Sequence, residues 1–414
     1  MEISLLALYA VMLPVIILFC GLSIDVGLIE LKKLQMQTAA DAGAIGAELE
    51  WERGTSDQGV RGQADAALNG FTNGVDNVTV DVTGPPPGGD YNNRYDAQYV
   101  PITQTVNTIF MGALHGGKTT VSASAVSLMP PCGYMMNTAG ISNAYGLNIT
   151  NTMSVPSQGL YPRCPVYINH GLYLASSMNL DGYALNATGT AGQSSVNNSE
   201  WPPATYGALT VTDPLAGVTQ PTASACNHTN FSASASVTLS PGTYCGSSST
   251  PGMTLSGSST TISFNPGLYV ITGGLHATTA VSLSGAGVTL FFTKGSGVPY
   301  GKIIFDGDTH VNLSAPSVSS GGALAYILFF TDRNWVHTSA QDFQFNDAVY
   351  YGSGIWYVTG TGIQMTDGSS TWSPGYLDVV ADSIYIDSST LNLFSDFSAI
   401  NTGNPFRTRA VLVQ

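Results

Sequence analysis

The chain has 414 residues and a formal net charge of −14 at pH 7, and only 9% of its residues are charged, against roughly 25% in an average globular protein. This composition argues against a nucleic-acid-binding protein, because neutralising phosphates requires clusters of Lys and Arg that the sequence lacks. Hydrophobic residues make up 43% of the chain, enough for a sizeable core, and the length fits about two or three domains.

The N-terminus predicts a helix that crosses a membrane. Ile3–Ile24 contains 22 residues without a charge, and at about 1.5 Å per residue it can cross a bilayer core of about 30 Å. Apolar residues then recur in steps of three and four as far as Leu49, so we expect the helix to reach about Arg53 and to resume over Arg61–Asn69. A cleaved signal peptide is a poor fit, because no basic region precedes the apolar run and no break follows it.

Several features of this helix point to assembly with other helices. Pro14 removes a backbone donor and is expected to kink or locally melt the helix. The small residues of Thr38–Ala47 would let neighbouring helices approach closely, although an Ala-rich surface helix is the alternative. Acidic residues in the apolar environment are unfavourable unless the nearby lysines or a neighbour's N-terminal amine pair with them. The predicted assembly residues are Glu2, Pro14, Asp25, Lys32, Lys33, Asp41, Ala42 and Gly46.

Two signals conflict on which side of the membrane the rest of the chain lies. The basic residues nearest the apolar run lie on its C-terminal side, which alone would place the bulk of the chain in the cytoplasm. Four cysteines beyond the helix form an even set, however, as in proteins of oxidising compartments. One resolution is that a basic leader has been removed and Met1 begins a mature, pilin-like subunit. The alternative is an ordinary anchor with Met1 as its initiator.

A small α+β module is expected next, over residues 71–131. Asn77–Val82, Tyr95–Ile102 and Lys118–Leu128 alternate as strands, and Val106–Leu114 is expected to form a short helix between the last two.

From Cys132 onward, short β-branched runs alternate with Gly, Pro and Asn. Pro-Gly turns followed closely by an aromatic residue start at Pro241 and Pro266, 25 residues apart, and again at Pro374. Short strands with tight Gly-rich turns, at roughly one rung per 20–25 residues, suggest a parallel β-solenoid, with an antiparallel sandwich as the alternative. The strands expected here are Met253–Leu255, Thr261–Phe264, Leu268–Thr272, Val281–Leu283, Val288–Phe292, Lys302–Phe305 and His310–Leu313.

The predicted fold class is therefore α+β. It comprises a long N-terminal hydrophobic helix (1–70), a small connecting module (71–131) and a C-terminal all-β surface domain of the β-solenoid kind (132–414).

Two groups of residues resemble a known family. Leu13-Pro14, Gly21–Gly27 and Leu34–Ala44 resemble the N-terminal segment of TadG-like proteins of tight-adherence (Flp) pilus systems, which begin with a type IV pilin-like helix. Asn265–Leu275 and Gly285–Phe292 are similar to the C-terminal region of many such proteins. The resemblance implies a membrane-inserted, pilus-associated bacterial surface protein and not an enzyme.

Few residues suggest catalysis or ligand chemistry. Asp306 with Asp308, and Asp332 beside Arg333, are the nearest candidates for the carboxylates of a polysaccharide-cleaving enzyme, but an Asp-Gly-Asp is more often a solvated turn. We expect no catalytic residues, no metal and no cofactor. Two disulfides are expected, Cys132 with Cys164 and Cys226 with Cys245. Candidate glycosylation sites are Asn77, Asn148, Asn186, Asn197, Asn227, Asn230 and Asn312.

These observations lead to one functional hypothesis and two alternatives. The chain is expected to be the structural subunit of an extracellular, cell-surface filament: a homo-oligomer whose helix leaves the inner membrane to join a helical bundle. The first alternative is a membrane-anchored adhesin that binds glycans through exposed aromatic residues and does not polymerise. The second is a β-helical carbohydrate-active enzyme, which would need carboxylates with shifted pKa values in a cleft.

Overall fold

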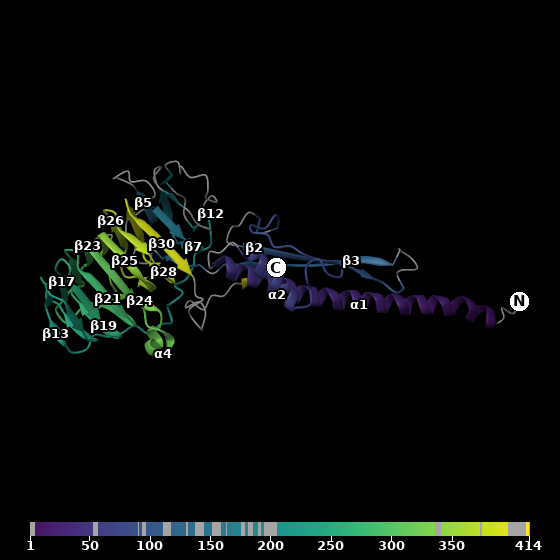
Figure 1. The fold of residues 1–414 in the computed structure, drawn as a ribbon, viewed down its shortest axis with the longest axis horizontal. Coiled ribbons are helices and arrows are strands. Elements are labelled where there is room, and N and C mark those ends of the chain that lie inside the picture. Colours follow the sequence, from purple (N-terminus) through teal and green to yellow (C-terminus); the bar gives the residue numbers. More distant parts are fainter. Residues whose placement is uncertain are drawn as a thin grey trace. The chain divides into compact units, whose positions relative to one another are not determined.

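The structure is a computed structural model. It describes residues 5–52, 57–89, 91–92, 97–110, 117–129, 131–136, 145–150, 159–162, 164–174, 179–180, 185–188, 192–193, 205–335, 341–372, 375–395 and 411–413. The chain forms two compact units (Figure 1). Unit 1 comprises Met1–Met129 and Ala410–Gln414, and unit 2 comprises Pro130–Arg409.

Unit 1 contains two helices and an antiparallel sheet of order β1-β2-β3-β31. Its elements are α1 (Leu5–Glu52), α2 (Gln58–Leu68), β1 (Val78–Val80), β2 (Ala97–Asn107), β3 (Lys118–Leu128) and β31 (Val411–Leu412). The two predicted helices and the three predicted strands are confirmed. The predicted helix over Val106–Leu114 is wrong at its start, where Val106 and Asn107 end β2; residues 111–114 lie outside the described residues.

The core of unit 1 lies between α1 and the β2–β3 hairpin. Val100 and Ile102 of β2 alternate inward, as do Val121, Ala123 and Ala125 of β3, because successive side chains of a strand point to opposite faces. They pack on one stripe of α1 made of Met36, Ala39, Ala40 and Ala44. Small residues on this stripe let the helix lie close to the sheet.

Unit 2 is mostly β-structure. Its first group of strands is β4 (Gly133–Met135), β5 (Tyr145–Thr150), β6 (Gly159–Pro162), β7 (Val166–Ile168), β8 (Gly171–Leu174), β9 (Asn179–Leu180), β10 (Leu185–Ala187), β11 (Gly192–Gln193) and β12 (Thr205–Tyr206). The second group is β13 (His228–Thr229), β14 (Phe231–Ala233), β15 (Val237–Leu239), β16 (Gly242–Cys245), β17 (Met253–Ser256), β18 (Thr261–Phe264), β19 (Gly267–Thr272), β20 (Leu275–Thr278), β21 (Ser282–Ala286), β22 (Val288–Thr293) and β23 (Ile303–Ser314). The remaining elements are α4 (Val318–Gly321), the 3-10 turn η1 (Gly322–Leu324), β24 (Ile327–Thr331), β25 (Phe343–Val358), β26 (Ile363–Thr366), β27 (Ser370–Trp372), β28 (Tyr376–Ala381), β29 (Ile384–Asp387) and β30 (Thr390–Ser395).

Among these described strands the pairing is parallel, apart from β28 with β30. Over much of the unit each strand pairs with the strand three places further along the chain, as β16 does with β19 and β19 with β22. The antiparallel sandwich that the sequence left open is therefore wrong. The two strands expected at Lys302–Phe305 and His310–Leu313 are a single strand, β23, with an irregularity in register between Asp306 and Thr309.

The order of strands in space differs from their order in the chain. One ladder runs β13-β16-β19-β22-β24-β25-β28-β4-β7-β10-β12, so the first strand of unit 2 lies inside the ladder and pairs with β28 near the end of the unit. Val379 of β28 lies opposite Gly133 of β4. Figure 1 shows yellow β28 and β30 next to blue-teal β5 and β7.

The segment 207–227, here called the strap, connects β12 at one end of this ladder to β13 at the other. Its apolar residues Val211, Leu215 and Val218 pack on the outward side of the ladder, against Phe330 and Tyr357 among others. The opposite side of the same strands faces an aromatic interior that includes Phe345 stacked on Trp356, with ring centroids 5.0 Å apart. This explains why β22, β24 and β28 are buried on both faces and read as continuous apolar runs.

Candidate functional site

The N-terminal part of α1 is a bare apolar rod. Every residue from Met12 to Phe19 is exposed; Phe19 is 64% exposed. Eight consecutive exposed residues cover all directions around a helix of about 3.6 residues per turn, so within the described chain nothing packs on any face of this stretch. By length and composition the helix is apolar enough to cross a membrane, and only 11% of its most apolar stretch is buried.

Pro14 lies inside this stretch, and α1 continues through it from Leu5 to Glu52. The helix is therefore not divided at Pro14, and a local kink there stays a prediction. Glu2 lies outside the described residues.

After the rod, α1 packs on the β2–β3 hairpin of its own chain, and Asp25 lies in this contact. Its carboxylate is buried and accepts hydrogen bonds from the backbone N–H groups of Ile109 and Phe110, at 2.9 and 2.7 Å. One turn earlier, a Cβ added to Gly21 would lie 2.2 Å from the Phe110 ring, so only glycine fits beneath that side chain. We call this contact between α1 and the end of the β2–β3 hairpin the clasp (Gly21, Asp25, Ile109 and Phe110).

The clasp explains how the charge of Asp25 is stabilised next to the apolar run. The sequence suggested a cation as the partner of Asp25, and the structure places two backbone donors there. Two N–H groups aimed at a carboxylate stabilise its charged form in the way a helix N-terminus does. Lys32 instead lies over the Phe71 ring, 4.6 Å from its centroid, and Lys33 is exposed. The sequence signal for a backbone partner was absent, because nothing in residues 108–110 marks them as donors.

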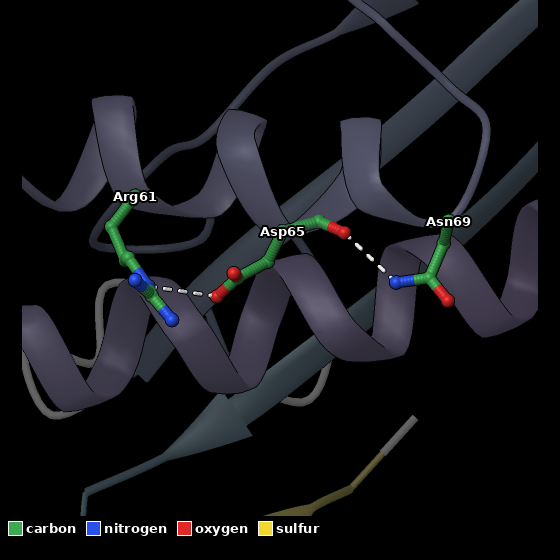
Figure 2. Close-up of polar contacts among 3 residues, drawn as sticks. All are labelled: Arg61, Asp65 and Asn69. Carbon is green, nitrogen blue, oxygen red and sulfur yellow. Dashed lines mark hydrogen bonds and ion pairs between the residues drawn. The ribbon is translucent and has the colours of Figure 1, made fainter.

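The small-residue stretch of α1 packs against α2 of the same chain. A Cβ on Gly43 would meet the carbonyl oxygen of Gly62 at 3.0 Å, and one on Gly46 would fall 1.9 Å from Asp65 Oδ2. Figure 2 shows how Asp65 is held on α2: it pairs with Arg61 at 3.0 Å, and its carbonyl accepts from Asn69 at 2.8 Å.

The close approach predicted from these small residues is thus used within the chain. Of the remaining predicted assembly residues, Asp41 accepts a hydrogen bond from Gln37 at 2.8 Å, Ala42 is half-buried and Gly46 is buried. Their role in contacts between subunits stays a prediction.

Residues 4–50 match the family model described as "Putative Flp pilus-assembly TadE/G-like". The matched TadE/G-like segment contains the bare rod, Gly21 and Asp25 of the clasp, and the small residues that face α2. No curated protein and no solved structure matches the chain. The match and the apolar helix together fit a membrane-anchored, cell-surface protein involved in Flp pilus assembly.

The candidate catalytic residues lie in unit 2, outside the TadE/G-like segment. Asp306 Oδ2 lies 3.1 Å from His276 Nε2, and Asp308 Oδ1 lies 3.6 Å from His310 Nε2. Asp308 occupies a turn at φ 62° with most of its side chain in solvent, as expected for a solvated Asp-Gly-Asp turn. In the described parts of the chain, no group of three His, Cys, Asp or Glu side chains is arranged to hold a metal ion.

Asp332 and Arg333 hold the strap. Arg333 donates from Nη1 to the carbonyl of Val218 at 2.9 Å and from Nη2 to that of Leu215 at 2.8 Å, and its Nε donates to the Tyr357 hydroxyl at 2.6 Å. Asp332 accepts from Gln220 Nε2 at 2.9 Å. These two charged residues therefore tie the strap to the corner that follows β24.

The hydrogen bonds around Asp332 shift its acidity. Burial alone would raise the pKa of this carboxyl, but donors from Thr293, the Asn334 backbone, Gln220 and Tyr300 outweigh burial and hold its pKa below the usual range. Burial and the neighbouring Asp332 charge raise the pKa of Tyr300 to about 12. A carboxylate kept charged by four donors is a structural anchor; a general acid needs a raised pKa.

Both expected disulfides are confirmed, Cys132 with Cys164 and Cys226 with Cys245. The second fastens the last turn of the strap to β16. Of the candidate glycosylation sites, Asn77, Asn227, Asn230 and Asn312 are exposed and Asn148 is half-buried, whereas Asn197 and the side chain of Asn186 lie outside the described residues. Their modification stays a prediction.

Proposed function

We propose that this chain is a structural subunit of an extracellular pilus-like filament. Its bare rod would reside in the inner membrane before assembly and would then pack among the rods of other copies, which replace lipid around the same apolar surface. The observation that carries the proposal is the exposure of Met12–Phe19 on all sides, in a segment that matches a pilus-assembly family. Apolar surface of this extent is stable in water only when lipid or protein covers it.

We further propose that unit 2 is a β-solenoid displayed outside the cell, with glycans on its exposed sequons. The parallel pairing of every third strand supports stacked coils, because each coil can bury its apolar residues only against the next. The two disulfides and the scarcity of charge support an oxidising, extracellular setting.

Fibre formation can be tested at a residue that the fold does not use. Leu31 lies on α1 after the rod and is 54% exposed, so Leu31→Glu should leave unit 1 folded and abolish fibres by placing a charge between packed helices. The matched control is Val60→Glu on α2, at an exposed apolar position (71%) away from the rod. Cells carrying each variant would be sheared, and the released fibres imaged and identified by mass spectrometry.

Fibres that contain the wild-type chain and are lost only in Leu31→Glu would support the filament. Wild-type chain that stays in the membrane fraction as a monomer would refute it. Substituting Ala42 or Gly46 is a poor test, because Gly46 packs inside the monomer and its loss would disturb the fold itself.

A second candidate function is a membrane-anchored adhesin that binds glycans without polymerising. It is favoured by one observation: Tyr351 and Trp372 expose their rings on neighbouring strands of unit 2. Under this alternative, Leu31→Glu cells would bind surfaces as well as the wild type does.

We propose no enzymatic activity for the chain. The engagement of Asp332 and Arg333 with the strap supports a structural role for the pair. Replacing Asp306 and Asp308 by Asn should leave every surface or glycan phenotype unchanged; polysaccharide cleavage by the wild type that this double variant lacks would refute the proposal.

A further inference from the structure

Two large aromatic side chains are exposed side by side on unit 2. Trp372 of β27 is 56% exposed and Tyr351 of β25 is 44% exposed, and the parallel register places them directly opposite each other. Neighbouring strands lie about 4.8 Å apart, so the two rings belong to one small patch. Among the described residues of unit 2, the other exposed large apolar side chains are aliphatic and lie elsewhere in the sequence: Leu209, Val237 and Val318.

The aromatic pair lies in a row of neutral polar side chains. The strand register continues from Tyr351 through Asn312, Ser284 and Ser263 on successive strands. Two residues earlier on each strand, a parallel row contains Val349, His310, Ser282 and Thr261. His310 lies parallel to the Tyr351 ring, with an angle of 1° between planes and 6.5 Å between centroids. We call these two rows the aromatic face.

The charges on and around this face restrict what it can bind. Neither row contains a Lys or Arg. The exposed residues Asp308 in β23, Asp347 in β25 and Asp367 before β27 lie two or three residues ahead of the row positions on those strands. A net charge of −14 adds to the repulsion of anions. Nucleic acids and acidic polysaccharides are therefore disfavoured, and an uncharged partner fits.

A sugar ring can pack on the aromatic rings of this face and form hydrogen bonds with its polar side chains. The C–H groups on one side of a pyranose ring carry a partial positive charge and pack on the negative face of an aromatic ring. Ring hydroxyls can exchange hydrogen bonds with the Ser, Thr and Asn side chains that line the rest of the rows. Exposed aromatic rings with adaptable polar neighbours also make up the typical recognition surface of a binding protein.

We propose that the aromatic face of unit 2 binds an uncharged glycan chain, with Tyr351 and Trp372 as stacking platforms and Asn312 and His310 as polar contacts. The glycan lies across successive strands. This inference rests on the display of unit 2 outside the cell, and its test does not require fibres to form, so the two can fail separately.

The test uses the full chain, produced in a host that adds no N-glycans and kept in lauryldimethylamine oxide micelles, since a sugar-based detergent would compete. Hexasaccharides of β-1,4-linked glucose, of N-acetylglucosamine and of α-1,4-linked galacturonic acid are titrated by calorimetry and by saturation-transfer NMR. We expect a neutral hexasaccharide to bind with a Kd of about 1 mM or tighter and the anionic one not to bind. Tyr351→Ala and Trp372→Ala should each weaken binding about tenfold, as for a central contact residue.

Controls separate a local effect from a global one. Leu209→Ala removes a more exposed apolar side chain (89%) from the strap and should bind as the wild type does, and Trp372→Phe should keep affinity within about threefold because a ring remains. Absence of binding by every neutral hexasaccharide, equal binding of the anionic one, or unchanged affinity in both alanine variants would overturn the proposal. So would a wild-type dimer that the alanine variants convert to a monomer, since the face would then belong to a second copy.

Discussion

Replacing Arg333 by Ala tests whether the strap is held by the contacts that the structure shows. The guanidinium makes three hydrogen bonds, to the carbonyls of Leu215 and Val218 and to the Tyr357 hydroxyl. Each is worth roughly 1 kcal/mol at a half-buried site, and truncation leaves two carbonyls under the strap without this donor. We expect the free energy of strap opening to fall by about 3 kcal/mol, which raises the open population roughly 150-fold.

Thermolysin measures this population, because it cleaves before apolar residues such as Leu215 and Val218 and requires an opened chain. When opening and closing are fast relative to cleavage, the cleavage rate follows the open population. The cut site is identified by mass spectrometry of the denatured fragments, which separate because neither the Cys132–Cys164 nor the Cys226–Cys245 disulfide spans a cut at Leu215 or Val218. Arg333→Lys keeps the positive charge but loses the planar guanidinium that donates to both carbonyls, so its cleavage rate should lie between those of the wild type and Arg333→Ala.

The matched control is Arg61→Ala, because Arg61 pairs with Asp65 at a similar distance but is 54% exposed (Figure 2). Loss of this surface ion pair should change stability by no more than about 0.5 kcal/mol and leave strap cleavage unchanged. A cleavage rate for Arg333→Ala within about threefold of wild type would refute the assigned role of Arg333.

Three further predictions concern the other contacts. Asp25→Ala should leave the N–H groups of Ile109 and Phe110 without their acceptor and speed hydrogen exchange of the hairpin peptide by about tenfold or more, whereas unchanged exchange would rule out the clasp. Gly46→Leu should destabilise unit 1 by about 3 kcal/mol or more in urea unfolding, because its side chain would occupy the position of the Asp65 carboxylate; a full-stability variant would contradict the α1–α2 packing. The folded pKa of Asp332 is depressed, so its stabilising contribution is fully present above its unfolded pKa of about 3.9 and is lost as pH falls through the folded value. Strap cleavage by an acid-active protease should therefore rise only below about pH 4, and this rise on lowering the pH should be absent in Asp332→Asn.

Local structure could largely be predicted from the sequence. The apolar run and the three- and four-residue steps predicted α1, and alternation predicted β1, β2 and β3. Thr261–Phe264 was predicted with its bounds, because a strand between two turns needs only local information. The spacing of the cysteines sufficed for both disulfides.

Partners distant in sequence could not be predicted. The pairing of Val379 with Gly133 joins segments almost at opposite ends of unit 2, and alternation specifies which side chains face inward but not which strand lies alongside. The same limit explains the small residues of α1: their size indicates that another helix comes close, and α2 of the same chain satisfies that signal as well as another subunit would. The partner of Asp25 was missed because backbone N–H groups are present at every residue except proline and leave no mark in the sequence.

The order of strands in unit 2 has a reason in how the unit is inserted. β3 ends at Leu128, which lies opposite Val411 of β31, so the chain leaves unit 1 and returns to it at paired positions. Strands stacked in simple sequence order would place the first and last strands at opposite ends of a ladder, far from each other. Here β4 lies beside β28, and the strap carries the chain from β12 at one end of the ladder to β13 at the other, from which the later strands continue the ladder toward β28. Because the two ends of the inserted unit must meet, its first strand lies inside the ladder and the strap links the ladder's two ends. Asp332 and Arg333 hold this connecting strap in place.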